Sequence, residues 1–388
     1  MLIDCSASLT WYYLKPSYIC TIIIIIIIIM KQERSAAAII CLMITCVLCL
    51  SLLLCYYYYY YPTTDEVSFT DDRRMERLML LGNSSATHAK PSSMMTTQIT
   101  MCTMLKNEAK YVREWVEFHS LLGVNRFIIF DNDSSDSLRA ALNGTIAEAI
   151  IIPWPPKHWL PGNPHEERCQ GYKDGKYRDD WAYSYCQTAA FHECLRWERG
   201  RSRWVAGVDV DEFFMPRYSA NGLRTLQEAL KPYEHMHGIS LGSFTYGTSH
   251  HTLPIAAGDL MIETHLLRGN DPGVVKEFVD PQKADTYHCV HWAHYTDPLW
   301  NTLIMRTVPR WRSAVRFNHF PFRSIIESRH KVFKNMNPGI YQEIDKWDKV
   351  DIEDLFLVPM VPLIRRRLTG ERIWIRHDTS MTQLGNKG

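Results

Sequence analysis

The chain has 388 residues, and its 43 Lys and Arg residues nearly balance its 42 Asp and Glu residues, giving a formal net charge of +1 at pH 7. This balance excludes the strongly basic surface typical of nucleic-acid binding, and 46% apolar residues are enough for a sizeable core. With 19 Gly and 19 Pro, the chain is neither collagen-like nor broadly disordered. The composition therefore indicates a globular protein of one or two domains.

An uncharged run at 36–55 dominates the N-terminal part of the chain. It is about as long as a bilayer core requires, Lys31 and Arg34 precede it, and tyrosines occupy 56–61. We therefore predict a cytosolic tail and transmembrane anchor over 31–61, with the rest of the chain lumenal, as in a single-pass type II protein. Residues 1–30, which contain a long isoleucine run, are interpreted as a doubtful extension because Met30 is an alternative start.

The polar segment 62–98 is rich in Ser, Thr and Met and lacks sustained periodicity, so it predicts a stem or linker. Regular apolar patterns begin at Ile99. They predict a large globular domain over 99–365, followed by a C-terminal tail over 366–388.

Strand-like and helix-like patterns alternate within this domain. Apolar runs at 99–105, 126–130, 149–152 and 204–208 predict buried strands, whereas apolar faces over 112–122 and 181–195 predict helices. Such alternation indicates βαβ units, and hence an α/β fold with a mostly parallel, Rossmann-like sheet flanked by helices.

Clustered polar residues follow three of these four strands, at 106–108, 131–136 and 209–212. Ligands of parallel sheets bind at the carboxyl ends of the strands, so these clusters are expected to converge. Asp209 and Asp211 stand at i and i+2 of an extended strand end and can share one divalent cation, which can bridge a diphosphate. No G-x-G-x-x-G or P-loop element is present, which argues against a classical dinucleotide or P-loop site.

Several stretches carry a resemblance to a known family. They are MCTMLKNEAKYVREWVEFHSLLGVNRFIIFDNDSSD, the segment 187–211 that leads into WVAGVDVDEFF, and the later GSFTYGTSHH, KEFVDP, HCVHW and FNHFPFRSIIESRHK. In this order, over roughly 99–334, they resemble glycosyltransferase family 92, the DUF23 group. The resemblance implies a GT-A fold, a sugar-nucleotide donor, Mn²⁺ and a type II Golgi anchor. The family is known for β-galactosyl transfer with inversion.

Under this resemblance the chain is expected to be a membrane-anchored glycosyltransferase of the Golgi that moves galactose from UDP-galactose to a glycan acceptor. The residues expected to contact uracil or ribose are Asn107, Glu108, Asp131 and Asp133. Lys276 or Arg323 is expected to balance the remaining phosphate charge. The expected Mn²⁺ ligands are Asp209 and Asp211, completed by His291 or His319. Inversion needs a carboxylate base, for which Glu263 is the first candidate and Asp271 the alternative.

Two rival functions remain open at this point: a non-catalytic sugar-binding membrane protein and a lumenal metallohydrolase. The second would use a histidine cluster formed by His288, Cys289, His291 and His294. A G-x-S-x-G match at 238–242 suggests a nucleophile elbow, but the apolar alternation that continues through Ser240 favours an ordinary strand.

Five cysteines lie beyond residue 61, too few for a disulfide scaffold. Cys186 and Cys194 stand about 12 Å apart on the predicted helix, too far to bridge each other, and the other pairings stay open.

Overall fold

The structure is a computed structural model, and it describes residues 99–156, 162–173, 182–219, 222–301, 306–310, 312–329, 346–373 and 375. The predicted extension, anchor and stem over 1–98 lie outside these residues. Across the described ranges, no helix is long and apolar enough to cross a bilayer.

A mixed sheet of ten strands forms the centre of this part of the chain. Its strands are β1 (Ile99–Leu105), β2 (Arg126–Asp131), β3 (Glu148–Pro153), β4 (Trp204–Gly207), β5 (Glu212–Pro216), β6 (Gly238–Tyr246), β7 (Leu267–Val279), β10 (Thr307–Val308), β11 (Val315–His319) and β12 (Ile352–Glu353). A separate hairpin consists of β8 (Ala284–Cys289) and β9 (Trp292–Tyr295).

The main strand order is β3-β2-β1-β4-β7-β6-β11-β5. The first four strands pair in parallel, as the alternating sequence pattern predicts. The other half departs from that pattern: β7 is antiparallel to both β4 and β6, and β5 is antiparallel to β11. The chain reverses direction in the short turn between β4 and β5, and β7 returns beside β6 without a long crossover helix, so neither strand runs parallel to the one before it.

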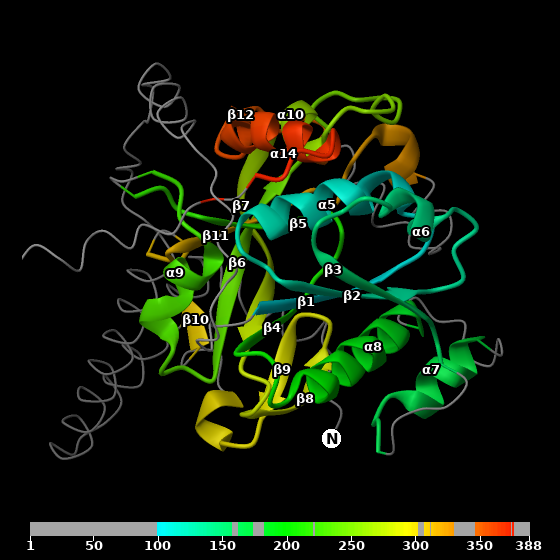
Figure 1. The fold of residues 1–388 in the computed structure, drawn as a ribbon, viewed down its shortest axis with the longest axis vertical. Coiled ribbons are helices and arrows are strands. Elements are labelled where there is room, and N and C mark those ends of the chain that lie inside the picture. Colours follow the sequence, from blue (N-terminus) through cyan, green and yellow to red (C-terminus); the bar gives the residue numbers. More distant parts are fainter. Residues whose placement is uncertain are drawn as a thin grey trace, which may run out of the picture. The chain divides into compact units, whose positions relative to one another are not determined.

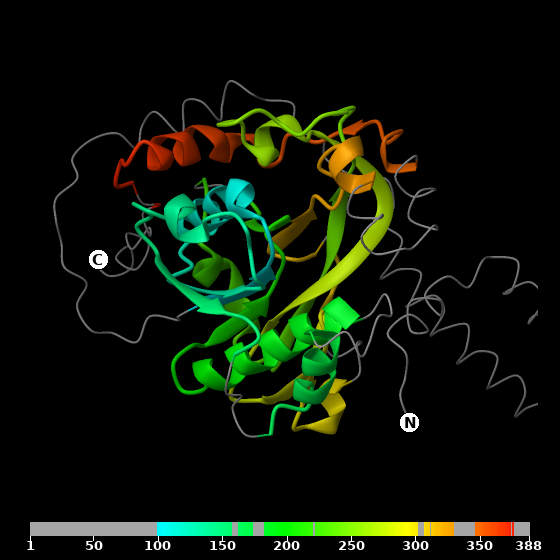
Figure 2. The ribbon, with the colours of Figure 1, turned by 90° about the vertical axis from the view of Figure 1, so that its right-hand side faces the viewer.

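Helices accompany the sheet in the described part of the chain. They are α5 (Ala109–Leu121), α6 (Leu138–Ala141), α7 (Glu166–Lys173), α8 (Ala182–Glu198), α9 (Leu226–Leu230), α10 (Met261–Thr264) and α14 (Val361–Leu368), with short 3₁₀ helices η1 (Lys231–Tyr233), η2 (Pro298–Asn301) and η3 (Val358–Met360). In Figure 1, α5 and α14 lie on one side of β1 and β2, and α7 and α8 lie on the other. Figure 2 shows the sheet edge-on between these two layers, with the long strand β7 strongly curved.

The side chains of β1 show why a continuous apolar run becomes a central strand. Ile99, Met101 and Leu105 are buried in the cluster that includes α5, whereas Cys102 and Met104 are buried in the cluster that includes α8. Because successive residues of a strand point to opposite faces, a strand covered on both sides is apolar at most of its positions rather than at every second one. The predicted buried strand is confirmed.

The predicted helix 112–122 corresponds to α5, which ends where Gly123 adopts a φ of +91°. A Cβ atom there would meet only the movable end of the Gln227 side chain, so it is the left-handed backbone conformation that favours glycine. His119 is fully buried: its Nδ1 lies 2.9 Å from the Trp115 carbonyl and its Nε2 accepts from the Phe214 amide at 3.1 Å. His119 is therefore a core residue of the helix.

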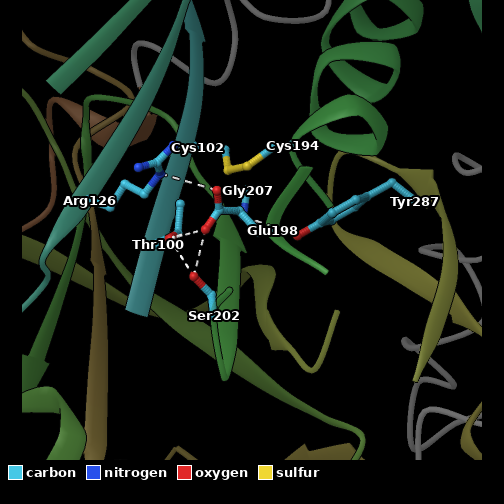
Figure 3. The surroundings of a disulfide bond; sticks show 8 residues. All are labelled: Thr100, Cys102, Arg126, Cys194, Glu198, Ser202, Gly207 and Tyr287. Atoms are coloured by element: carbon cyan, nitrogen blue, oxygen red, sulfur yellow. Dashed lines mark hydrogen bonds and ion pairs between the residues drawn. A yellow bond between two sulfur atoms is a disulfide. The ribbon is translucent and has the colours of Figure 1, made fainter. Parts of the chain in front are cut away.

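Two disulfides attach α8 to its surroundings. Cys194 pairs with Cys102 on β1, and Cys186 pairs with Cys169 on α7. The prediction that Cys186 and Cys194 do not bridge each other is therefore confirmed. Beside the first disulfide, the buried carboxylate of Glu198 accepts hydrogen bonds from Thr100 and Ser202 (Figure 3).

The helix α14 extends to Leu368, three residues beyond the end predicted for the globular domain. It packs on α5 through Arg367, whose Nε donates to Oε2 of Glu117 at 2.8 Å with both side chains fully buried. Loss of either partner would leave a buried charge without compensation, so this pair holds the C-terminal helix on the domain.

A buried carboxylate also fixes the start of α10. Glu114 on α5 accepts hydrogen bonds from the amides of Met261, at 2.8 Å, and Ile262, at 3.1 Å. Burial raises the pKa of Glu114 to about 7, although these two hydrogen bonds oppose the rise. The folded protein therefore retains a proton that the unfolded chain has released at intermediate pH.

This proton predicts a specific pH dependence of stability. The contribution of Glu114 is fully present below pH 4.5 and is lost as the pH rises through about 7, because the folded pKa lies above the ordinary value of 4.5. Relative to Glu114→Gln, the wild type should thus lose unfolding free energy between these pH values, measured by urea denaturation. Glu148→Gln, at a side chain that is 53% exposed, is the matched control. A wild-type minus Glu114→Gln difference that is flat across this window would refute the prediction.

The two disulfides should contribute unequally to stability. Their sequence separations are 92 and 17 residues. The entropy of loop closure then predicts a loss of about 4–5 kcal/mol for Cys102→Ala/Cys194→Ala and about 3 kcal/mol for Cys169→Ala/Cys186→Ala. Chemical denaturation of the two double variants measures this order directly, and a larger loss for the second pair would contradict it.

Candidate functional site

The carboxyl ends of four strands meet at one edge of the sheet. Among them, β1 is parallel to β2 and β4, with Leu105 opposite Asp131 and Cys102 opposite Gly207. Two antiparallel steps through β7 make β6 run in the same direction as β4, and β11 is parallel to β6. The predicted convergence of the ends of β1, β2 and β4 is confirmed, and the end of β11 joins them.

The loops that follow β1 and β2 are joined by hydrogen bonds. Oδ1 of Asn107 accepts from the amide of Ser135 at 2.7 Å, and Oδ1 of Asp131 accepts from the amide of Ser134 at 3.0 Å. Asn107 and Asp133 adopt positive φ angles of 59° and 54°, a left-handed conformation that asparagine and aspartate adopt more readily than most other non-glycine residues. Three predicted nucleotide contacts, Asn107, Asp131 and Asp133, thus lie on two adjoining loops.

Asp209 belongs to a tight turn between β4 and β5 that closes on itself. Its amide donates to Oε2 of Glu212 at 2.8 Å, and the amide of Glu212 donates back to the Asp209 carbonyl at 3.1 Å. Nζ of Lys276, from β7, lies 3.3 Å from Oδ2 of Asp209 and 3.2 Å from Oε2 of Glu212. The other oxygen of Asp209, Oδ1, accepts from the side-chain amide of Gln187 on α8.

Asp211 is paired with the guanidinium of Arg323, which follows β11. Nη2 of Arg323 lies 3.5 Å from Oδ2 of Asp211, and Nη1 donates to Oε2 of Glu108. The guanidinium also lies over the ring of Tyr111, 4.1 Å from its centroid. The structure thus brings together Glu108, Asp211 and Arg323, three of the predicted site residues.

Both predicted histidines lie beside the same turn. Nε2 of His319 is 3.8 Å from Oδ1 of Asp211 and 3.9 Å from Oε1 of Glu212, its partner in the β11–β5 ladder. Nδ1 of His291 lies 3.0 Å from the Val275 carbonyl, and since a carbonyl only accepts, Nδ1 carries the hydrogen and Nε2 keeps its lone pair. Burial, reinforced by Lys276, lowers the pKa of His291 to about 4, so this imidazole is neutral at pH 7.

The cluster carries more negative than positive charge. Asp209, Asp211, Glu212 and Glu108 provide four carboxylates, against the two cations Lys276 and Arg323. Burial raises the pKa of Glu212 to about 8, and repulsion from Asp209 and Asp211 adds to this rise, so Glu212 carries a full negative charge only above that pH. Below it, Asp209, Asp211 and Glu108 still outnumber the two cations. The Lys276 pKa is raised above its ordinary value because the two carboxylates outweigh the effect of burial. An additional positive charge would therefore be stabilised here.

The donor atoms fit a hard divalent cation such as Mn²⁺, which prefers carboxylate oxygens and accepts imidazole. In the part of the chain that the structure describes, however, no three His, Cys, Asp or Glu side chains already converge as a set that could hold a metal ion. Instead, Lys276 and Arg323 contact the oxygens of Asp209 and Asp211 that a cation would take.

Of the two candidate bases, the structure describes the side chain of Glu263 only. Glu263 lies on α10 and pairs with Arg365, with side chains that are 36% and 46% exposed. No hydrogen bond or ion pair between described residues connects Glu263 to the 209–212 turn. The side chain of Asp271 lies outside the described part. The assignment of either residue as the base stays a prediction.

Two competing interpretations of the sequence can now be assessed. Ser240 is fully buried in the middle of β6, opposite Glu277 of β7, so the G-x-S-x-G match is an ordinary strand, as its apolar alternation predicts. His288, Cys289 and His294 lie on the β8–β9 hairpin, and they form no metal-ligand group among the described residues.

Glu212 and Gln187 are site residues that sequence reasoning did not identify individually. Glu212 has a detectable pattern, because it is a third carboxylate directly after Asp209-Val210-Asp211. Gln187 has none, since a glutamine on a helix is common and only the packing of α8 brings its amide to Asp209.

Solved structures with some similarity include two glycosyl-transferring enzymes. Glucosyl-3-phosphoglycerate synthase from Mycobacterium tuberculosis, in complex with Mn²⁺ and UDP-glucose, is 15% identical, with 38% of this chain and 44% of that chain covered and a TM-score of 0.22. The mannosyltransferase Ktr4p from S. cerevisiae is 10% identical, with 52% and 57% covered and a TM-score of 0.22. TM-scores of this size do not establish a shared fold.

Curated relatives are plant proteins. A glycosyltransferase family 92 protein of Ricinus communis is 31% identical over 134 residues, which are 34% of this chain and 19% of that protein. One of Oryza sativa subsp. japonica is 31% identical over 133 residues, 34% of this chain and 18% of that protein. The chain thus matches about a fifth of the length of these relatives.

The model of glycosyltransferase family 92 matches residues 97–320, more than half of the chain. This range contains β1, β2, β4 and the Asp209–Glu212 turn, and it ends directly after β11. The match confirms the resemblance that the sequence blocks indicate: the chain belongs to glycosyltransferase family 92.

Proposed function

We propose that this protein is a metal-dependent glycosyltransferase that moves a hexose, galactose from UDP-galactose, to a glycan acceptor with inversion at the anomeric carbon. The observation that carries the proposal is the meeting of four strand ends around an acidic turn with an excess of negative charge. A family 92 chain with this arrangement matches the expected GT-A organisation of donor site and cation site.

The donor nucleoside is proposed to lie on the two loops that follow β1 and β2. Asn107 and Asp131 already accept hydrogen bonds within these loops, which gives the loops a defined shape. Asp133 is exposed there, and Glu108 lies between these loops and Arg323. Preformed loops of this kind reduce the entropy lost when a ribose or uracil binds.

The diphosphate is proposed to lie over the Asp209–Glu212 turn. Asp209 and Asp211, with His291 or His319, would hold Mn²⁺, which when bound neutralises charge on the leaving diphosphate. Lys276 and Arg323 add two positive charges from β7 and from the segment after β11. No glycine-rich phosphate loop is present, so these side chains supply what backbone amides supply elsewhere.

In an inverting transfer, an acceptor hydroxyl oxygen bonds to the anomeric carbon while the bond from that carbon to the diphosphate oxygen breaks. A carboxylate takes the hydroxyl proton as this occurs. We propose Glu263 for this role, with Asp271 the alternative. Glu263 now pairs with Arg365, so it would have to exchange this contact for the acceptor hydroxyl. Both side chains are partly exposed, which leaves room for such an exchange.

The proposed location is the Golgi lumen, with a single anchor in 31–61 and the N-terminus in the cytosol. The anchor rests on the uncharged run at 36–55 and the basic residues before it. The two disulfides support a lumenal domain, since such bonds persist in oxidising compartments and are rare in the cytosol.

Transfer assays with the full-length protein test the proposed reaction. With a panel of sugar nucleotides and glycan acceptors, we expect transfer from UDP-galactose that requires Mn²⁺ and stops in EDTA. Asp211→Asn should lower the rate by about 10²–10³-fold or more, because it removes a carboxylate from the acidic turn. Asp285→Asn, at an exposed position on β8, is the matched control and should leave transfer unchanged.

The same assays separate the rival functions. A sugar-binding protein would show no turnover of any donor, whereas a metallohydrolase would release free sugar from donors or glycans at a rate that acceptors do not increase. Near-normal transfer by Asp211→Asn at saturating donor would contradict the role of the acidic turn, and preference for GDP- or CMP-sugars would contradict the proposed nucleotide.

Protease treatment of intact microsomes tests the proposed topology. If 31–61 anchors the chain with its N-terminus in the cytosol, the domain from Ile99 onward should stay intact until detergent opens the membrane. Digestion of that domain without detergent would place it on the cytosolic side. An antibody to a cytosolic tag at the N-terminus provides the internal control.

A further inference from the structure

Each carboxylate of the Asp209-Val210-Asp211 element is already paired with a cationic side chain from a distant part of the sequence. Lys276 contacts Asp209, and Arg323 contacts Asp211. Lys276 also pairs with Glu212 and is 1% exposed, so it is bound into the domain interior. Arg323 differs because its partners, Asp211 and Glu108, both belong to the strand ends that form the candidate site.

Arg323 also has contacts on the side away from Asp211 and Glu108. Its carbonyl accepts from Nε2 of His265, and its guanidinium lies over Tyr111. The hydroxyl of Tyr111 donates to Oε1 of Glu327 at 2.6 Å, and Ser324 donates to Oε2 of the same residue at 2.7 Å. The backbone and the aromatic surface beneath the guanidinium are thus fixed, while its two ion pairs face the site.

A divalent cation and a guanidinium cannot both occupy one carboxylate oxygen. Asp211 presents Oδ2 to Arg323, and the repulsion between the two cations at short range is strong in a partly buried site. An ion that takes Oδ2 of Asp211 therefore displaces Arg323 from this carboxylate. Its planar fork, still anchored beside Glu108, would then be available to a nearby phosphate, which it can bind through two parallel hydrogen bonds.

We infer that Arg323 is an exchangeable counter-ion of the acidic turn: it occupies Asp211 until the divalent cation binds, and it then pairs with the donor diphosphate. This inference rests on the proposed function and deepens it, because it couples cation binding to nucleotide binding. Arg323 lowers the affinity for the cation when no nucleotide is present, and it raises the affinity for the cation and the nucleotide when they bind together.

Removal of the guanidinium charge should have opposite effects on the two ligands. In the full-length protein, Arg323→Gln should bind Mn²⁺ alone about tenfold more tightly than the wild type, because a competing cation is gone. With Mn²⁺ saturating, it should bind UDP about tenfold more weakly, because a charged phosphate contact is lost. Free Mn²⁺ is measured by electron paramagnetic resonance, and UDP binding by calorimetry.

Two further variants control for charge and folding. Arg323→Lys keeps the positive charge and should bind Mn²⁺ alone nearly as the wild type does. Arg366→Gln removes an arginine from an exposed pair with Glu371, and it should change neither affinity. Thermal unfolding of each variant shows whether the domain is still folded.

The inference is overturned if Arg323→Gln binds Mn²⁺ no more tightly than the wild type, or if it loses affinity for both ligands, as a purely structural role would require. If the wild type shows Mn²⁺-dependent transfer in either case, only the inference fails. If neither protein binds Mn²⁺ yet transfer proceeds in EDTA, the metal dependence of the proposed function fails together with the inference.

Discussion

A buried lysine holds together the two halves of the sheet where the candidate site forms. From the antiparallel strand β7, Nζ of Lys276 reaches Glu212 at 3.2 Å and Asp209 at 3.3 Å, which both lie in the turn after the parallel strand β4. Removing one partner of a buried ion pair typically costs about 3–5 kcal/mol, because a desolvated charge is left alone. The acidic turn is therefore stable only where β7 supplies a counter-charge, and the remaining site residues are arranged around this pairing.

The other face of the sheet supports the same turn through covalent crosslinks. Gln187, whose amide contacts Asp209, directly follows Cys186, and Cys186 is bonded to Cys169. The same helix is tied to β1 through Cys194 and Cys102. An oxidising compartment thus stabilises not only the domain but also the position of one hydrogen-bond donor at the acidic turn. This connection agrees with the lumenal location that we propose.

The family match includes the acidic turn, whereas Arg323 is connected to this turn only by the geometry of the site. The family match ends at residue 320, so it includes Asp209, Asp211 and His319 but not Arg323. The contact between Arg323 and Asp211 is seen only in the structure. If Arg323 exchanges between Asp211 and the donor diphosphate as we infer, affinity for an ion at this turn depends on the nucleotide that binds with it. Because coupling between two ligands is reciprocal, the nucleotide would then raise the affinity for the cation by the same factor by which the cation raises the affinity for the nucleotide.

The parallel half of the fold and the acidic turn can be predicted from the amino-acid sequence alone. The apolar run 99–105, the helix face at 112–122 and the strand before Asp209 carry local periodicity, and local periodicity is what a sequence displays directly. The antiparallel half, the pairing of Cys102 with Cys194 and the contact of Lys276 with the turn become apparent only in the folded domain. Those features join residues tens of positions apart, and their pairing depends on strand order and packing, which leave no periodic mark on the chain.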